Sequence, residues 1–189
     1  MKYRYTATYL QKHPIEAYSA AMIMQDQIVR KEDWDEIERE SYGADWDRLR
    51  SEYRQESADG LFRLMRCDGS KVCHFLVVEA VLEREEEMLP IIKRRLLTTC
   101  NEFFVEAAAR FLADCKENCA QWILAHYGEV RSPFMQSALC LILGLRADLS
   151  VADFLFREVE GFERMYPDEM YEQGPLLGLD NLEVRYGRF

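Results

Sequence analysis

Apolar residues recur at helical spacing in the second half of the chain, and one pattern occurs there three times. Within each run the apolar positions are i, i+3, i+4 and i+8, which lie on one face of an α-helix. The runs start at residues 88, 119 and 151, so they are 31 and 32 residues apart. Their members are Met88, Ile91, Ile92 and Leu96, then Cys119, Trp122, Ile123 and Tyr127, then Val151, Phe154, Leu155 and Val159.

A second apolar stripe follows each of the first two runs. Its members are Phe104, Ala108, Phe111 and Leu112 and, thirty residues later, Phe134, Ala138, Leu141 and Ile142. A third copy begins near Tyr171, where we expect Gly174 and Pro175 to interrupt it. A helix pair of about 31 residues cannot bury both apolar faces alone, so neighbouring pairs must stack. The pattern predicts an all-α fold, an α-α superhelix of about three helix pairs.

Helix start signals agree with this division. Each is a Ser or Thr that can cap a helix, followed either by an acid three residues later or by a proline at the first helical position. The expected caps are Thr99 with Glu102, Ser132 with Pro133, and Ser150 with Asp153.

Two interpretations of residues 61–79 remain open. Asp68-Gly69 between apolar runs could form a β-hairpin. Alternatively, Gly69 ends one helix in the left-handed conformation and Ser70 caps a buried helix that runs to Leu82. We favour the helices, because the following segment is helical and repetitive.

The first 70 residues read as an N-terminal helical extension of one continuous domain, whose remaining part, 71–189, holds the repeats. Residues 2–9 alternate like a strand, and a helix is expected from Pro14 to Arg30. Trp34 and Trp46 then occur in similar Asp-Trp-Asp contexts between short helices. Rings flanked by acids can form a recognition surface, but they more often pack inward while the acids remain hydrated.

The chain carries a formal net charge of −10, with a pI of about 4.9. An acidic surface repels phosphate, which argues against nucleic acid and anionic membranes as partners and suits a basic protein. High net charge is also a common means of staying soluble. We expect no signal peptide, because polar residues interrupt the apolar stretch near residues 11–16, and the longest apolar run has about seven residues. The six cysteines lack C-x-x-C spacing. We therefore expect a cytoplasmic protein.

Motifs that carry chemistry are missing from the sequence. It contains no phosphate-binding loop, dinucleotide fingerprint, H-E-x-x-H or nucleophile elbow. Cys115, Cys119 and His126 are the nearest approach to a metal-ligand set. A helix break expected between Asp114 and Asn118 would keep them off one continuous helix face. We therefore expect neither a metal nor a cofactor.

Two segments resemble a HEAT repeat, a member of the armadillo-type α-solenoids. Residues 87–92, with Pro90 early in a first helix, precede the Ala-rich stripe of residues 105–112 in a second. The resemblance covers about 70–180 and is strongest in 86–114. Glu106 departs from the family pattern, which often has Arg there. The resemblance implies a superhelical fold with a binding surface.

The leading functional hypothesis is a non-catalytic scaffold that binds a protein or peptide, basic in character, on the concave surface lined by the second helices. Exposed polar and aromatic positions make up the candidate site. They are Glu102, Glu106, Arg110, Gln136 and Gln173, together with Trp34 and Trp46.

Two other classes of function remain open. The first is an enzyme on a HEAT-like scaffold, of the DNA glycosylase or lyase type, although the acidic charge opposes DNA binding. The second is an assembly or tethering subunit that uses the apolar C-terminal residues Leu182, Val184, Tyr186 and Phe189. The oligomeric state is not predicted.

Overall fold

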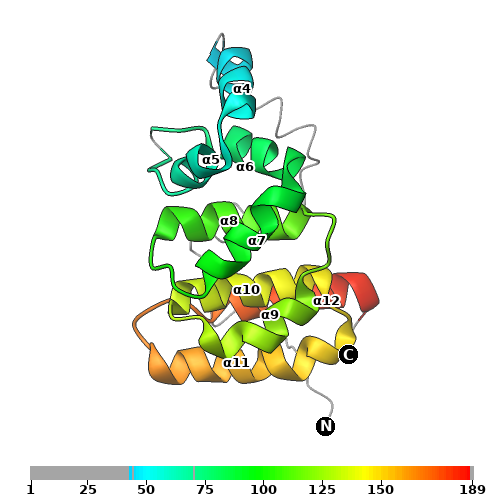
Figure 1. Ribbon diagram of the computed structural model, residues 1–189. Helices are drawn as coiled ribbons and strands as arrows, with labels where there is room; N and C mark the ends of the chain where they lie inside the picture. The colour runs from blue at the N-terminus through cyan, green and yellow to red at the C-terminus, as the bar shows by residue number, and fades with distance from the viewer. Residues whose placement is uncertain (1–42, 44, 70, 188–189) are drawn as a thin grey trace.

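A computed structural model describes residues 43, 45–69 and 71–187, and all regular elements within these ranges are helical (Figure 1). The prediction of an all-α fold is therefore confirmed for this part of the chain. The expectations for residues 2–9, for the helix from Pro14 to Arg30 and for Trp34 fall outside it. The α-helices are α4 (Asp45–Gln55), α5 (Ala58–Leu64), α6 (His74–Glu83), α7 (Glu85–Leu96), α8 (Glu102–Asp114), α9 (Ala120–His126), α10 (Pro133–Arg146), α11 (Ala152–Met165) and α12 (Gln173–Tyr186), with 3₁₀ turns η1 (Tyr127–Glu129) and η2 (Leu149–Val151).

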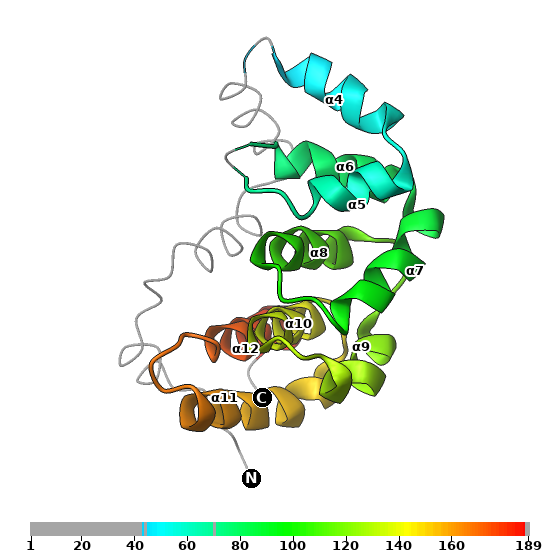
Figure 2. The same ribbon diagram turned by 60° about the vertical axis from the view of Figure 1, so that its left-hand side comes forward.

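Five helices form one row, in which α4 packs on α6, α6 on α8, α8 on α10 and α10 on α12 (Figure 2). Helices α5, α7, α9 and α11 connect them and return the chain to the same edge of the row each time. The row helices are therefore parallel. We call the side where they begin the N-terminal edge and the side where they end the C-terminal edge. Of the helices described, none is long and apolar enough to cross a membrane.

Contacts between the ends of the row helices show their common direction. The guanidinium group of Arg50 in α4 pairs with the carboxylate of Glu79 in α6 at 2.6 Å. One turn later in both helices, Arg54 pairs with Glu83. Near the other end of the row, Arg146 of α10 donates a hydrogen bond to the carbonyl of Cys115, directly after α8. These two joints link residues 29 and 31 positions apart in the chain.

The three predicted apolar runs lie in or around α7, α9 and α11 and are buried in the same way. In each run the first, third and fourth positions are buried and the second is half-buried. The stripe predicted for α8 is completely buried, whereas in α10 only Leu141 and Ile142 are buried, and Phe134 and Ala138 are half-buried. Helical periodicity thus identified the core-facing positions correctly.

Residues 61–79 form the end of α5, a loop and most of α6, so the hairpin alternative is wrong. The expected glycine cap is also wrong, because among the described residues only Gly43 and Gly187 have positive φ. Helix α5 ends at Leu64, well before Gly69, and α6 begins after Cys73. Ser70 lies outside the described residues. The His74 ring donates to the Cys67 carbonyl at 2.7 Å, and this contact closes the loop.

Ser132 is the N-cap of α10, as predicted, and its Oγ accepts a hydrogen bond from the Met135 backbone N–H at 3.3 Å. Thr99 does not cap α8. Its hydroxyl accepts from the backbone N–H of Asn101, and the Asn101 side chain accepts from Phe104 N–H at 2.8 Å. Asn101 is the correct distance from the first free N–H groups of the helix, and it caps at least as well as threonine.

Ser150 does not cap α11, because a 3₁₀ turn comes first. The Asp148 carboxylate accepts from the backbone N–H of Ser150 at 2.9 Å and from its hydroxyl group. An ionised carboxylate is a stronger acceptor than a hydroxyl, so Asp148 starts the turn Leu149–Val151 and α11 follows from Ala152. Ser150 therefore donates to the capping residue Asp148 and is not itself a cap.

Gly174 and Pro175 do not interrupt the last helix. They lie in the first turn of α12, where a proline lacks no needed hydrogen bond. The glycines of α12 bring it very close to α10. A Cβ placed on Gly174 would lie 2.0 Å from the Ser137 carbonyl oxygen, and one on Gly144 would lie 2.2 Å from the Cα of Gly178. The backbones of α10 and α12 are in direct contact here, and a methyl group at either glycine would prevent that contact.

Candidate functional site

Helix α8 carries three of the predicted site residues on one face. Glu102, Glu106 and Arg110 are four residues apart in turn, so they follow one another along the helix. The two glutamates are exposed and Arg110 is half-buried. The structure therefore places these three polar side chains together, beginning at the N-terminal edge of the row.

Of the other predicted residues that the structure describes, two are buried. Gln136 is half-buried in α10. Gln173 is buried at the start of α12, and Trp46 is only 1% exposed. The Trp46 ring stacks on Phe75 with centroids 6.0 Å apart, and Arg50 covers it. Both side chains are buried, and Trp46 packs between α4 and α6, so neither offers the exposed recognition surface that was predicted.

An aromatic cluster lies where α11 passes into α12. The ring centroids of Tyr166 and Tyr171 are 5.4 Å apart, and Tyr171 is 6.0 Å from Phe162. The Tyr171 carbonyl accepts a hydrogen bond of 2.6 Å from the hydroxyl of Ser137 in α10. The loop between the two helices is thus fixed to the N-terminal half of α10.

Electrostatics connect this loop to α8. Burial raises the pKa of Tyr171, and the negative charges of Glu169 and Glu102 raise it further. The charge of Glu102 in α8 therefore acts on the Tyr171 phenol at long range, although α10 separates α8 from α12 in the row. Residues 166–172 contain three acids and no base. The surroundings of the ring are consequently negative.

Exposed apolar side chains adjoin these acids. Phe103 is 37% exposed and its ring contacts that of His74, while Met170 is 46% exposed. We define the edge patch as Glu102, Phe103, Glu169, Met170 and Tyr171. Aromatic rings, methionine and carboxylates together suit a partner that offers both apolar and cationic side chains.

Sequence reasoning found only Glu102 of the edge patch. Phe103, Met170 and Tyr171 were missed, because the apolar pattern was searched for core positions. A usable signal was present in the segment Tyr-Pro-Asp-Glu-Met-Tyr-Glu, residues 166–172. Two tyrosines and a methionine among three acids, between two helices, are more apolar than an ordinary solvated turn requires.

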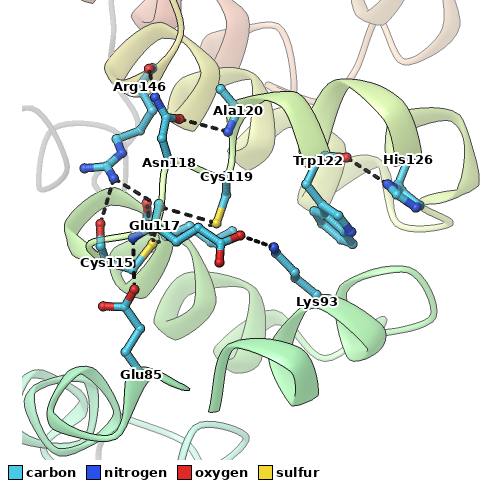
Figure 3. Close-up of polar contacts among 11 residues, drawn as sticks. Glu85, Lys93, Cys115, Glu117, Asn118, Cys119, Ala120, Trp122, His126 and Arg146 are labelled. Atoms are coloured by element: carbon cyan, nitrogen blue, oxygen red, sulfur yellow. Dashed lines mark hydrogen bonds and ion pairs between the residues drawn. The ribbon is translucent and has the colours of Figure 1, made fainter. Parts of the chain in front are cut away.

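The C-terminal edge is held by arginines that reach back to the preceding row helix. Arg146 at the end of α10 donates to the carbonyls of Cys115 and Glu117 (Figure 3) and also to that of Ala113. Arg185 of α12 donates in the same way to Gly144 and Ala147 of α10, at 2.9 and 2.8 Å. These cations satisfy carbonyl groups that a helix C-terminus leaves free. Their role is structural.

A buried polar cluster joins η1, α10 and α11. The Tyr127 hydroxyl donates to Glu158 at 2.8 Å and lies 3.2 Å from the Cys140 sulfur. Burial is the main cause that raises the pKa of Tyr127 and of Cys140. The phenol and the thiol therefore remain protonated, and the cluster joins three helices.

The predicted weakness of the Cys115, Cys119 and His126 ligand set has a clear geometric basis. Helix α8 ends at Asp114 and α9 begins at Ala120, so the expected helix break is confirmed. The His126 ring stacks on Trp122 and points away from the two thiols (Figure 3). Across the described ranges, no group of three or more His, Cys, Asp or Glu could hold a metal ion.

No protein-family model matches this chain, and no curated protein or solved structure matches it either. The assignment of a function therefore depends on the geometry of the row and on the chemistry of the edge patch.

Proposed function

We propose that this chain is a non-catalytic scaffold, a short HEAT-like α-solenoid that binds a protein or peptide. The parallel row supports the solenoid, because each connecting helix returns the chain to the same edge. Side-chain hydrogen bonds between successive layers also recur at a nearly constant separation. Arg50 to Glu79 spans 29 residues, Tyr127 to Glu158 spans 31 and Arg146 to Cys115 spans 31. A stack of similar two-helix units produces this regularity.

The solenoid includes more of the chain than the apolar runs indicate. Helices α4 and α5 pack on α6 in the manner of later layers. The helix pairs α5–α6, α7–α8, α9–α10 and α11–α12 then form four units, with α4 preceding them. All six cysteines are free thiols, which agrees with a reducing compartment such as the cytoplasm.

The edge patch is the proposed binding surface, and one observation carries this proposal. Stacking places Glu102 of α8 within electrostatic range of Tyr171, which precedes α12, so acidic and aromatic side chains from distant parts of the sequence share the N-terminal edge. Phe103 follows Glu102 in the sequence and Met170 precedes Tyr171, and both side chains expose apolar area. The partner that fits is a segment with apolar side chains flanked by lysine or arginine. Carboxylates steer such a segment to the surface, and the rings provide the contact area.

Affinity capture with matched variants tests this function. The full chain and the double variant Phe103→Ser with Met170→Ser are used as baits in extract of the source cells, at low and high salt. The control bait is Leu149→Ser with Val184→Ser, which removes equally apolar, exposed residues from the C-terminal edge. We expect a basic protein that the wild type and the control retain, that the edge variant loses, and that salt releases.

Two outcomes would contradict the proposal. If the edge variant captures the same proteins as the wild type, the edge patch binds nothing. If only the control variant loses the captured protein, the apolar residues at the C-terminal edge form the interface and the chain acts as an assembly subunit.

A further inference from the structure

Two thiols face each other in the turn that joins α8 to α9. Cys115 follows the last residue of α8 and Cys119 precedes the first residue of α9. Their sulfur atoms are 3.9 Å apart (Figure 3). A disulfide needs a separation of about 2.0 Å. The remaining gap of roughly 2 Å is within reach of side-chain rotation and a small movement of the turn.

The turn is held on both sides, which keeps the two sulfurs together. From one side Arg146 donates to the carbonyls of Cys115 and Glu117, and its own carbonyl accepts from the Asn118 side chain. From the other side the Glu85 carboxylate accepts from the backbone N–H groups of Lys116 and Glu117 at 2.8 and 2.9 Å. Their proximity is therefore built into the joint between two layers.

The two thiols differ electrostatically. The hydrogen bond from Cys115 lowers the pKa of Cys119, and the nearby cations Lys93 and Arg146 lower it further. The hydrogen bond with Cys119 and burial raise the pKa of Cys115. Cys119 is therefore the thiol that ionises first. Both side chains are buried, but the covering turn, residues 116–118, is exposed.

We propose that Cys115 and Cys119 form a reversible dithiol–disulfide pair that a hydroperoxide oxidises. The Cys119 thiolate attacks one peroxide oxygen, the O–O bond breaks, and hydroxide leaves with the released electron pair. The Cys115 thiol then attacks the sulfur of the sulfenic acid, loses its proton and expels water as the S–S bond forms. With hydrogen peroxide, two thiols and one peroxide yield one disulfide and two waters. A dithiol reductant reverses the change.

The test uses the reduced full-length protein and a limiting amount of hydrogen peroxide, followed by alkylation and tryptic digestion without reduction. Trypsin cleaves after Lys116 and so separates the two cysteines. A disulfide would keep the peptides 111–116 and 117–131 joined, two hydrogens lighter than their sum. Cys73 and Cys140 are equally buried and provide internal controls. We expect the pair to oxidise at least roughly tenfold faster than either control.

Single variants distinguish the thiol that attacks the peroxide from the thiol that attacks the sulfenic acid. In Cys115→Ser the sulfenic acid at Cys119 has no partner, so dimedone should trap it. In Cys119→Ser little trapping is expected at Cys115. Equal oxidation rates for all the buried cysteines, or no joined peptide while exposed Cys100 is oxidised, would overturn the proposal. Both of these measurements use the wild-type protein, so they remain decisive if a variant fails to fold.

Discussion

Gly144 of α10 and Gly178 of α12 lie where the backbones of the two helices are in direct contact, and replacing either should destabilise the protein. A Cβ on Gly144 would lie 2.2 Å from both the Cα and the carbonyl oxygen of Gly178. One on Gly178 would lie 2.6 Å from the carbonyl oxygen of Cys140. The obstructing atoms are backbone, so no rotamer change can relieve the clash. The substitution would force α10 and α12 apart.

Two effects of Gly144→Ala oppose each other. Alanine in a helix interior is favoured over glycine by about 1 kcal/mol. Overpacking a tight core contact costs about 1–3 kcal/mol, and moving two whole helices lies at the upper end of that range. We therefore expect Gly144→Ala to lower the free energy of unfolding by about 2 kcal/mol, which is roughly 4–8 °C in Tm for a chain of this size.

Gly161→Ala in α11 is the matched control, since the nearest atom to its Cβ would be Met165 Cε at 3.9 Å. Here only the helix propensity applies, so the variant should gain about 0.5–1 kcal/mol. Urea unfolding followed by circular dichroism at 222 nm measures both variants. If Gly144→Ala were as stable as Gly161→Ala, α10 and α12 could not be in backbone contact.

Three further predictions concern single residues. Arg146→Ala should lower the unfolding free energy by about 2 kcal/mol in urea titrations, because three carbonyls lose a charged donor, and Arg146→Lys should recover less than half of it. Ser132→Ala removes the N-cap of α10 and should cost about 1 kcal/mol in the same assay, whereas Ser150→Ala should cost less. Burial raises the pKa of Asp180 to about 6, with a smaller contribution from Glu183, so its ionisation opposes folding. This cost is absent below the ordinary pKa near 4 and complete above about 6. Asp180→Asn should therefore raise the Tm at pH 7.5 and leave it unchanged at pH 4. Because the carboxyl is partly exposed, we expect the free energy of unfolding at pH 7.5 to rise by about 1 kcal/mol.

The helical part of the fold was predictable because amphipathic periodicity is a local property. Positions such as Met88, Ile92 and Leu96 repeat at 3.6-residue spacing, and burial of one face follows directly. The N-cap of α8 was predicted at Thr99, two residues before the actual cap Asn101, and this error has a different origin. Thr99 and Asn101 are both competent caps, and only the geometry of the loop decides which of them meets the free N–H groups.

The binding surface was only partly predictable, because it depends on which helices stack. Glu102 could be expected on an exposed face of α8, but nothing local brings Tyr171 near it. Trp46 remained a candidate only because a ring flanked by acids can be exposed. The next layer covers it with Phe75, in agreement with the inward packing that is the more common outcome. Gly174 was likewise interpreted as a helix breaker, because its use in a close helix contact appears only in three dimensions.

Site-specific photocrosslinking in the source cells tests the proposed binding surface most directly. A benzophenone amino acid replaces Phe103 in the edge patch and, as the control, Tyr186 at the C-terminal edge, which is similarly exposed. We expect position 103 to crosslink to one basic protein that position 186 does not reach, with a yield that falls as salt rises. No crosslink at position 103, or the same products from both positions, would contradict the account.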